Sequence, residues 1–183
     1  MGIKLSKNIV LIGMRGAGKS AIGKILAEFL DWDFVDVDKT LEAGEGTTIS
    51  EIVAKHDWEH FRDLESKYTA LAAKKIPTVI STGGGVVLRD KNIRTLKKTG
   101  VVVLLHGPLE HLAKRVAKND KRPSLTGKSP VEELEEVWNT RKEKYEKAAD
   151  INIYFDFETK NKKTDLIRKS KMVLKAVQNF LNQ

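Results

Sequence analysis

The sequence has no cysteine, only four prolines and no apolar run near the roughly 20 residues of a membrane-spanning helix. The missing cysteines exclude a disulfide framework, a thiolate metal site and a thiol nucleophile. A first strand is predicted within about eight residues of the N-terminus, which leaves no room for a signal peptide. We therefore expect a cytoplasmic protein without a membrane partner.

Length and charge predict one globular domain over residues 1–183, because 40% of the residues are hydrophobic and 32% are charged. The net charge of +8 could indicate a nucleic-acid partner. However, most of the excess lies in residues 160–183, where seven Lys and Arg residues stand against the single acid Asp165. The rest of the chain is close to neutral, so we expect no nucleic-acid partner. We also expect a monomeric protein.

The most informative stretch is Gly13-Met14-Arg15-Gly16-Ala17-Gly18-Lys19-Ser20, which fits G-x-x-x-x-G-K-[ST] at every fixed position. An apolar run at 8–12 precedes it, and residues 21–30 follow with helical spacing. In that setting, backbone N–H groups and the helix start bind phosphates. Lys19 can reach the outer phosphates, and the Ser20 hydroxyl can bind Mg²⁺. The alternative, an ordinary glycine-rich turn, does not explain this agreement of motif and context.

Alternation of short apolar runs with helical patterns predicts an α/β fold. Strands are expected at 8–12, 32–37, 78–82, 101–105 and 151–155. Continuous apolar strands indicate a buried parallel sheet with helices on both faces.

Two helices have a predicted packing side. The helix that begins near Trp58 should turn Phe61, Leu64, Tyr68 and Leu71 inward. The last helix, predicted at about 166–181, should pack on the sheet through Leu166, Val173, Val177 and Phe180. A membrane surface is the less favoured alternative for this last helix.

Two acids, Asp36 and Asp38, lie at the end of the second predicted strand. In an open parallel sheet, ligands bind at the carboxyl edge. We expect the two acids to face opposite sides and to have separate roles. One acid can orient Mg²⁺ and the other can accept a hydrogen bond from a substrate hydroxyl. Helix capping is the alternative for either acid.

Three arginines and a run of glycines complete the set of candidate site residues. Arg62 and Arg141 lie within apolar-patterned helices, so each either extends to solvent or faces a pocket. Two converging arginines would suggest a carboxylate or phosphate substrate. Gly83-Gly84-Gly85 follows the third strand and exposes backbone N–H groups. Residues 118–130 are polar with Pro and Gly, which predicts a mobile lid that carries Arg122.

Taken together and in this order, these motifs resemble the shikimate kinase family over about residues 8–155. They are Gly13–Ser20, Asp36-Val37-Asp38, Phe61-Arg62-x-x-Glu65, Gly83–Gly85, Arg122-Pro123, and Arg141-x-x-x-Tyr145 with Ala149-Asp150.

The resemblance implies a phosphate-loop (P-loop) NTPase fold of the nucleoside monophosphate kinase type, with parallel strands in the order 2-3-1-4-5. It implies transfer of the γ-phosphoryl group of ATP to the 3-hydroxyl of shikimate, in the pathway to chorismate and aromatic amino acids. ATP would be bound by Gly13–Ser20, Arg115 and Arg122. Shikimate would be bound by Asp38, Arg62, Gly83, Gly84, Gly85 and Arg141. Ser20 and Asp36 would hold Mg²⁺, and Lys19, Asp38 and Arg122 would be catalytic.

The chain departs from the family pattern at three places: Asp57 before the Phe-Arg pair, Ser124 after Arg-Pro, and a 156–163 loop without proline. The third leaves the residues that contact adenine open. Two alternatives also stay open at this point. One is a gluconate-type sugar-acid kinase, which the Asp36-x-Asp38 and triple-glycine combination disfavours. The other is a non-catalytic relative, which should have lost Lys19, Asp38 or an arginine.

Overall fold

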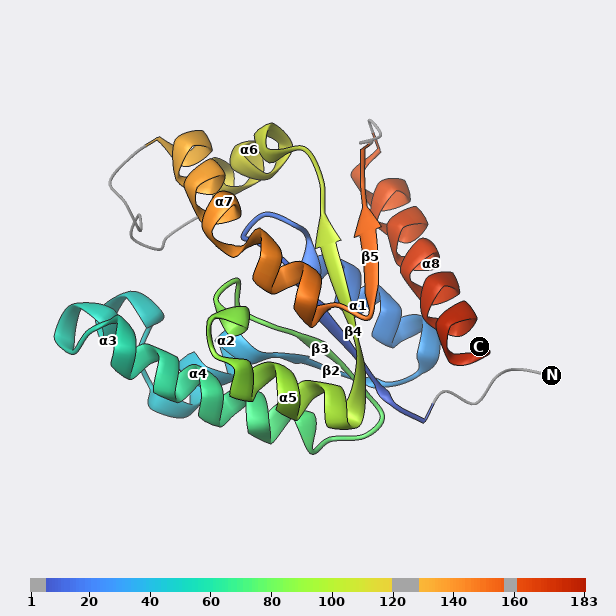
Figure 1. Ribbon diagram of the computed structural model, residues 1–183, viewed down its shortest axis with the longest axis horizontal. Coiled ribbons are helices and arrows are strands. Elements are labelled where there is room, and N and C mark those ends of the chain that lie inside the picture. The colour runs from blue at the N-terminus through green and yellow to red at the C-terminus, as the bar shows by residue number, and fades with distance from the viewer. Residues whose placement is uncertain (1–5, 120–128, 157–160) are drawn as a thin grey trace.

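Five short apolar strands form the centre of the molecule (Figure 1). The computed structural model describes residues 6–119, 129–156 and 161–183. The strands are β1 (Asn8–Ile12), β2 (Asp33–Asp36), β3 (Thr78–Ser81), β4 (Gly100–His106) and β5 (Ile151–Tyr154). All pairings are parallel and the order is β2-β3-β1-β4-β5, which confirms the predicted sheet.

Helices connect the strands. They are α1 (Lys19–Leu30), α2 (Val37–Glu45), α3 (Ile49–Lys55), α4 (Trp58–Ala73), the 3₁₀ turn η1 (Val86–Leu88), α5 (Asp90–Thr99), α6 (Leu109–Asn119), α7 (Pro130–Ala148) and α8 (Lys162–Leu181). None of the helices in the described ranges has the length and apolar character needed to cross a membrane.

The two faces of the sheet bury separate cores, because successive strand residues point to opposite sides. Val10 and Ile12 of β1 belong to one core, together with residues of α2, α4, α5 and α7. Ile9 and Leu11 belong to the other core, together with residues of α1 and α8. Figure 1 shows α8 running beside β5 and α1. Helices therefore cover both faces, as the continuous apolar strands predicted.

The second strand ends earlier than predicted. Asp36 is the N-cap of α2, and its side chain accepts a hydrogen bond from the backbone N–H of Lys39. Val37 and Asp38 therefore form the first turn of a helix and do not extend β2. The expectation that the two acids face opposite sides of a strand was wrong, because Asp38 lies in a helix and because residues two positions apart on a strand share a face.

The last helix begins at Lys162, earlier than the predicted residue 166, because Asn161 caps it by accepting a hydrogen bond from the N–H of Thr164. Val173 and Val177 are buried as predicted, but Phe180 is 40% exposed. Leu71 of α4 is likewise 48% exposed, so its predicted inward position was wrong. Both residues lie in the last turn of their helices, which end at Ala73 and Leu181, and helical spacing alone does not decide burial there.

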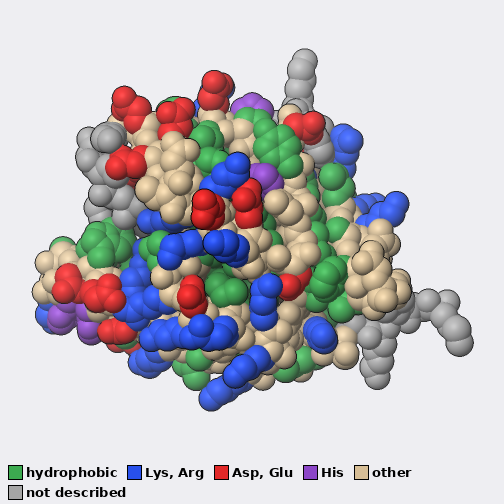
Figure 2. Space-filling model, in the orientation of Figure 1, with side chains coloured by type: hydrophobic (Ala, Val, Ile, Leu, Met, Phe, Trp, Pro, Cys, Tyr) green, Lys and Arg blue, Asp and Glu red, His purple; other side chains and the backbone are tan. Residues whose placement is uncertain are grey.

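Charged side chains are unevenly distributed over the surface. On the face shown in Figure 2, Lys and Arg gather over α5, and Asp and Glu gather near the start of α7. Within the nearly neutral part of the chain, basic and acidic side chains are therefore separated over this face.

Candidate active site

The loop between β1 and α1 has the conformation that the glycine pattern predicts. Gly13 and Gly16 have φ angles of 138° and 78°, which residues with a side chain rarely adopt. A Cβ on Gly13 would lie 2.2 Å from the carbonyl oxygen of Leu105, and one on Gly16 would lie 2.6 Å from that of Leu112. The loop is thus pressed against β4 and α6, and Gly18 leads directly into the N-terminus of α1. Such a loop presents N–H groups to an anion.

Lys19 folds back over this loop. Its side chain is largely buried, and Nζ donates hydrogen bonds to the carbonyl oxygens of Gly13, at 2.8 Å, and Met14, at 2.9 Å. These bonds hold a positive charge beside the backbone N–H groups, where the outer phosphates of a nucleotide would be neutralised.

A cluster of oxygen atoms lies next to the loop. The Ser20 hydroxyl donates to Asp36 Oδ2 at 2.6 Å and is 3.2 Å from the Ser81 hydroxyl. Mg²⁺ takes oxygen ligands, typically one or two carboxylates together with waters and phosphate oxygens, so these side chains fit that ion. In the described part of the chain, no group of three or more His, Cys, Asp and Glu side chains is arranged to hold a metal.

Asp38 lies in the first turn of α2, two residues after the Asp36 of this cluster. Its Oδ1 and Oε1 of Glu65 would both lie within 3 Å of a Cβ on Gly83, at 2.8 Å and 2.6 Å. Only a glycine lets the two carboxyl groups come this close to the strand end. The two acids of the Asp36-Val37-Asp38 motif therefore face different groups, although they lie at a helix start. The cap is Asp36, and capping does not explain Asp38.

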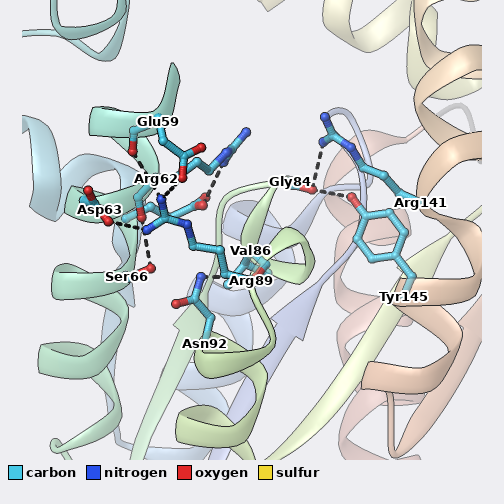
Figure 3. Close-up of polar contacts among 11 residues, drawn as sticks. Glu59, Arg62, Asp63, Ser66, Gly84, Val86, Arg89, Asn92, Arg141 and Tyr145 are labelled. Carbon is cyan, nitrogen blue, oxygen red and sulfur yellow. Dashed lines mark hydrogen bonds and ion pairs between the residues drawn. The ribbon is translucent and has the colours of Figure 1, made fainter. Parts of the chain in front are cut away.

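Arg62 and Arg141 converge from α4 and α7. Figure 3 shows them on either side of Gly84, with their guanidinium groups turned toward the same space. Arg62 donates to Glu65 Oε2 at 2.7 Å, and Arg141 donates to the Gly84 carbonyl at 3.4 Å, which also accepts from the Tyr145 hydroxyl. The predicted convergence of the two arginines is therefore present.

The start of α4 is tied to the segment after β3. Arg89, which directly follows η1, forms ion pairs with Glu59 and Asp63 on α4 (Figure 3). These pairs bracket Arg62 in sequence, so they help to set where its side chain emerges.

Burial alters the acid–base chemistry of two groups around the arginines. Desolvation raises the pKa of Glu65, although the positive charge of Arg62 opposes that shift. Burial also raises the pKa of Tyr145 to about 12, so its hydroxyl stays protonated and can donate to Gly84. Neither residue was among the predicted site residues, although both belong to the motifs that carried the family resemblance.

Two cavities meet at this edge of the sheet. The arginine pocket is lined by Asp38, Arg62, Glu65, Gly83–Gly85, Arg141 and Tyr145, among others. The loop cavity is lined by Gly16–Ile22 and Asp36, and it continues to Arg115 on α6 and to the first turns of α8. Arg15, Asp38 and Gly84 line both cavities. Asp38 therefore stands where a group bound in one cavity would meet a group bound in the other.

Of the remaining predicted site residues, Arg115 lies in the described part of the chain and Arg122 does not. Arg115 donates to the Gly16 carbonyl at 2.9 Å, so it lies against the phosphate loop. Arg122 and most of the predicted lid, 118–130, lie outside the described residues. The structure also brings Asp165 and Lys169 of α8 into the wall of the loop cavity. Sequence reasoning missed these two because it treated that segment as a basic surface.

A phosphate loop and an adjoining pocket with two arginines and an acid, on a 2-3-1-4-5 parallel sheet, define a P-loop kinase of small anionic molecules. The shikimate kinase family model matches residues 15–177. This chain belongs to the shikimate kinase family.

Individual relatives agree with this assignment. A shikimate kinase of Thermodesulfovibrio yellowstonii is 44% identical over 142 residues, which cover 78% of this chain and 82% of the relative. The solved shikimate kinase from Acinetobacter baumannii in complex with shikimate is 30% identical, with a TM-score of 0.85 over 94% of this chain and 93% of that one. A gluconokinase from Sinorhizobium meliloti 1021, at 18% identity and a TM-score of 0.52, shares the fold alone.

Proposed function

We propose that this protein transfers the γ-phosphoryl group of ATP to the 3-hydroxyl of shikimate and forms shikimate 3-phosphate. The observation that carries this proposal is the meeting of the two cavities at Asp38. A phosphate donor in one cavity and a carboxylate-bearing alcohol in the other would have their reacting groups side by side. Membership of the shikimate kinase family supports this choice of substrates.

On the donor side, the backbone of Gly13–Ser20 binds the phosphates and Lys19 neutralises the outer ones. The Ser20 hydroxyl and the Asp36 carboxylate would hold Mg²⁺, which would supply positive charge to the phosphates. Arg115 lies against the nucleoside. Arg122, which the family resemblance assigns to ATP, adds positive charge at the transferring group.

On the acceptor side, Arg62 and Arg141 bind the carboxylate of shikimate from two directions, since a guanidinium matches the two oxygens of a carboxylate. Gly83, Gly84 and Gly85 let the substrate approach the backbone closely. The Glu65 carboxylate holds Arg62 in place.

Asp38 accepts the hydrogen bond of the attacking hydroxyl and aims its oxygen at phosphorus. The transition state of phosphoryl transfer is loose, so placing this oxygen contributes at least as much as taking its proton. Lys19, Asp38 and Arg122 are accordingly the proposed catalytic residues. A lid that closes over both substrates would exclude water as a competing acceptor.

The test is an assay of ADP release with ATP and Mg²⁺ in three parallel reactions: with shikimate, with gluconate and without an acceptor. ADP release that depends on shikimate is the expected result. Equal release with gluconate would favour a sugar-acid kinase. No release with either acid, from protein that still binds ATP, would favour a non-catalytic relative. A monomeric state, a cytoplasmic location and the absence of a nucleic-acid partner remain predictions.

A further inference from the structure

The far wall of the loop cavity contains a buried ion pair. Lys169 Nζ is 2.7 Å from Asp165 Oδ2, and the two residues are only 2% and 7% exposed. Both lie on α8 and line the cavity together with Ile22, Arg115 and Leu166, among others. A well-packed apolar pair is often as stable as a buried ion pair or more stable. Packing therefore does not explain why charges occupy this position.

One oxygen of this pair is held ready for a ligand. Asp165 Oδ1 is buried and has no hydrogen-bond partner among the described residues, although Lys169 binds the other oxygen. A buried acceptor without a partner is unfavourable, and an ionised carboxylate can only accept. The group that completes this site must therefore be a hydrogen-bond donor.

The helix that carries the pair packs against α1, the helix that follows the phosphate loop. The Ser170 hydroxyl donates to the carbonyl of Leu166 at 2.8 Å and lies 3.4 Å from that of Ile22, in the helix that follows the loop. Figure 1 shows α8 beside α1. Asp165 thus lies on an element that packs against the helix into which the phosphate loop leads.

The position of the pair indicates which part of a nucleotide would reach it. The arginine pocket adjoins the loop on the side of α4 and α7, where the acceptor would bind. The nucleoside of a bound triphosphate must then extend the other way, toward α6 and α8. That end of the cavity offers apolar surface from Ile22, Val116 and Leu166, next to Arg115 and Asp165.

We propose that Asp165, held by Lys169, is a specificity-determining residue for the nucleoside. Its Oδ1 accepts a hydrogen bond from a donor group of the nucleoside, either the amino group of adenine or a ribose hydroxyl. The inference rests on the proposed function, because it takes the loop cavity as the ATP site.

The test compares kcat/KM for ATP, for ITP, which has an oxygen in place of the adenine amino group, and for the 2′- and 3′-deoxy forms of ATP. Wild type and Asp165→Asn are measured at saturating shikimate. Because Lys169 only donates, the asparagine oxygen turns toward Lys169 and its NH₂ turns toward the cavity. The hydrogen-bond polarity presented to the nucleoside is therefore reversed.

The KM for ATP should rise roughly 10- to 150-fold in Asp165→Asn, the range expected from losing a hydrogen bond to a charged group. The KM for shikimate should stay the same. The wild type should also have a lower kcat/KM for one class of analogue than for ATP, and this difference should disappear in Asp165→Asn. Loss of discrimination against ITP assigns the contact to the base, and loss against a deoxy form assigns it to the ribose. If the ratio of kcat/KM for ATP to kcat/KM for each analogue is the same in Asp165→Asn as in the wild type, the proposal is overturned.

Two further variants separate recognition from folding. The double variant Asp165→Leu/Lys169→Met removes both charges at similar volume. It should unfold near the wild-type temperature and lose the same discrimination. If it keeps the wild-type ratios of kcat/KM between ATP and the analogues, the pair is structural and the inference fails, even where Asp165→Asn alone does not fold.

Lys171→Gln, on the exposed side of α8, is the matched control and should keep all kinetic constants. A wild type without shikimate-dependent ATP turnover would refute the proposed function instead.

Discussion

Substituting Gly85 with alanine should displace the side chain of Arg62 from the substrate site, although Arg62 itself is not mutated. An added Cβ would lie 2.0 Å from Arg62 Nη1 and 2.3 Å from its Cζ. No Cβ tolerates such contacts, so the guanidinium must move. Gly85 has φ −98° and ψ 1°, a combination that alanine can also adopt, so the backbone need not change. We therefore expect Gly85→Ala to remain folded with Arg62 displaced from the pocket.

The size of the effect follows from the contact that is lost. A hydrogen bond to a charged partner contributes about 1.5–3 kcal/mol, and each 1.4 kcal/mol corresponds to about tenfold in affinity. The Kd for shikimate, measured by calorimetry, should therefore rise about 10- to 150-fold. The affinity for ATP should stay unchanged, because Gly85 does not line the loop cavity.

A double-mutant cycle tests the proposed cause. In an Arg62→Ala background, where the displaced group is absent, Gly85→Ala should cost nothing further. Wild-type affinity in Gly85→Ala would refute the steric argument. Additive losses in the cycle would show that the Cβ blocks the substrate directly and that Arg62 is not the mediator.

The remaining predictions concern four other positions. Lys19→Met should lower kcat by on the order of 10²–10³ while the circular dichroism spectrum stays native; near wild-type turnover would exclude Lys19 from the site. Asp38→Asn should lower kcat with little change in the KM for ATP, and unchanged kcat in steady-state assays would remove Asp38 from the acceptor site. Val177→Asp buries a charge at a position that is 1% exposed, so chemical denaturation should show a loss of more than about 3 kcal/mol, and a stable variant would contradict the packing of α8. Because burial raises the pKa of Glu65 above its ordinary 4.5, the folded state binds the proton more tightly. The stability of the wild type relative to Glu65→Gln should therefore fall as pH rises above 4.5, and parallel stability curves between pH 4 and 8 would count against this shift.

Local patterns were sufficient for the parts of this protein that are contiguous in sequence. The phosphate loop is one stretch whose glycines, lysine and serine act on the same anion, so its spacing alone predicts its conformation. The parallel sheet follows in the same way, because strands buried on both faces must be apolar throughout. The family resemblance added the strand order, which no single segment encodes.

The start of α2 could not be predicted from hydrophobic periodicity, because the choice between a longer strand and a helix cap depends on one side-chain hydrogen bond. Asp36 can extend a strand or cap a helix, and its hydrogen bond from Lys39 N–H settles the matter in favour of the cap. Asp36 and Asp38 were correctly predicted to have different neighbours, but for the wrong geometric reason.

Charged residues at the edge of an apolar helix stripe were decided only by tertiary structure. Arg62 and Arg141 come from helices 79 positions apart in the chain, and what places them together is the glycine segment between them. Lys169 has the same sequence character as the exposed Lys171, yet it is buried, with its Nζ bonded to Asp165 and lying over the ring of Phe155. Helical spacing states which residues share a face, whereas the depth of a charge depends on the neighbouring element, which the sequence of that helix does not contain.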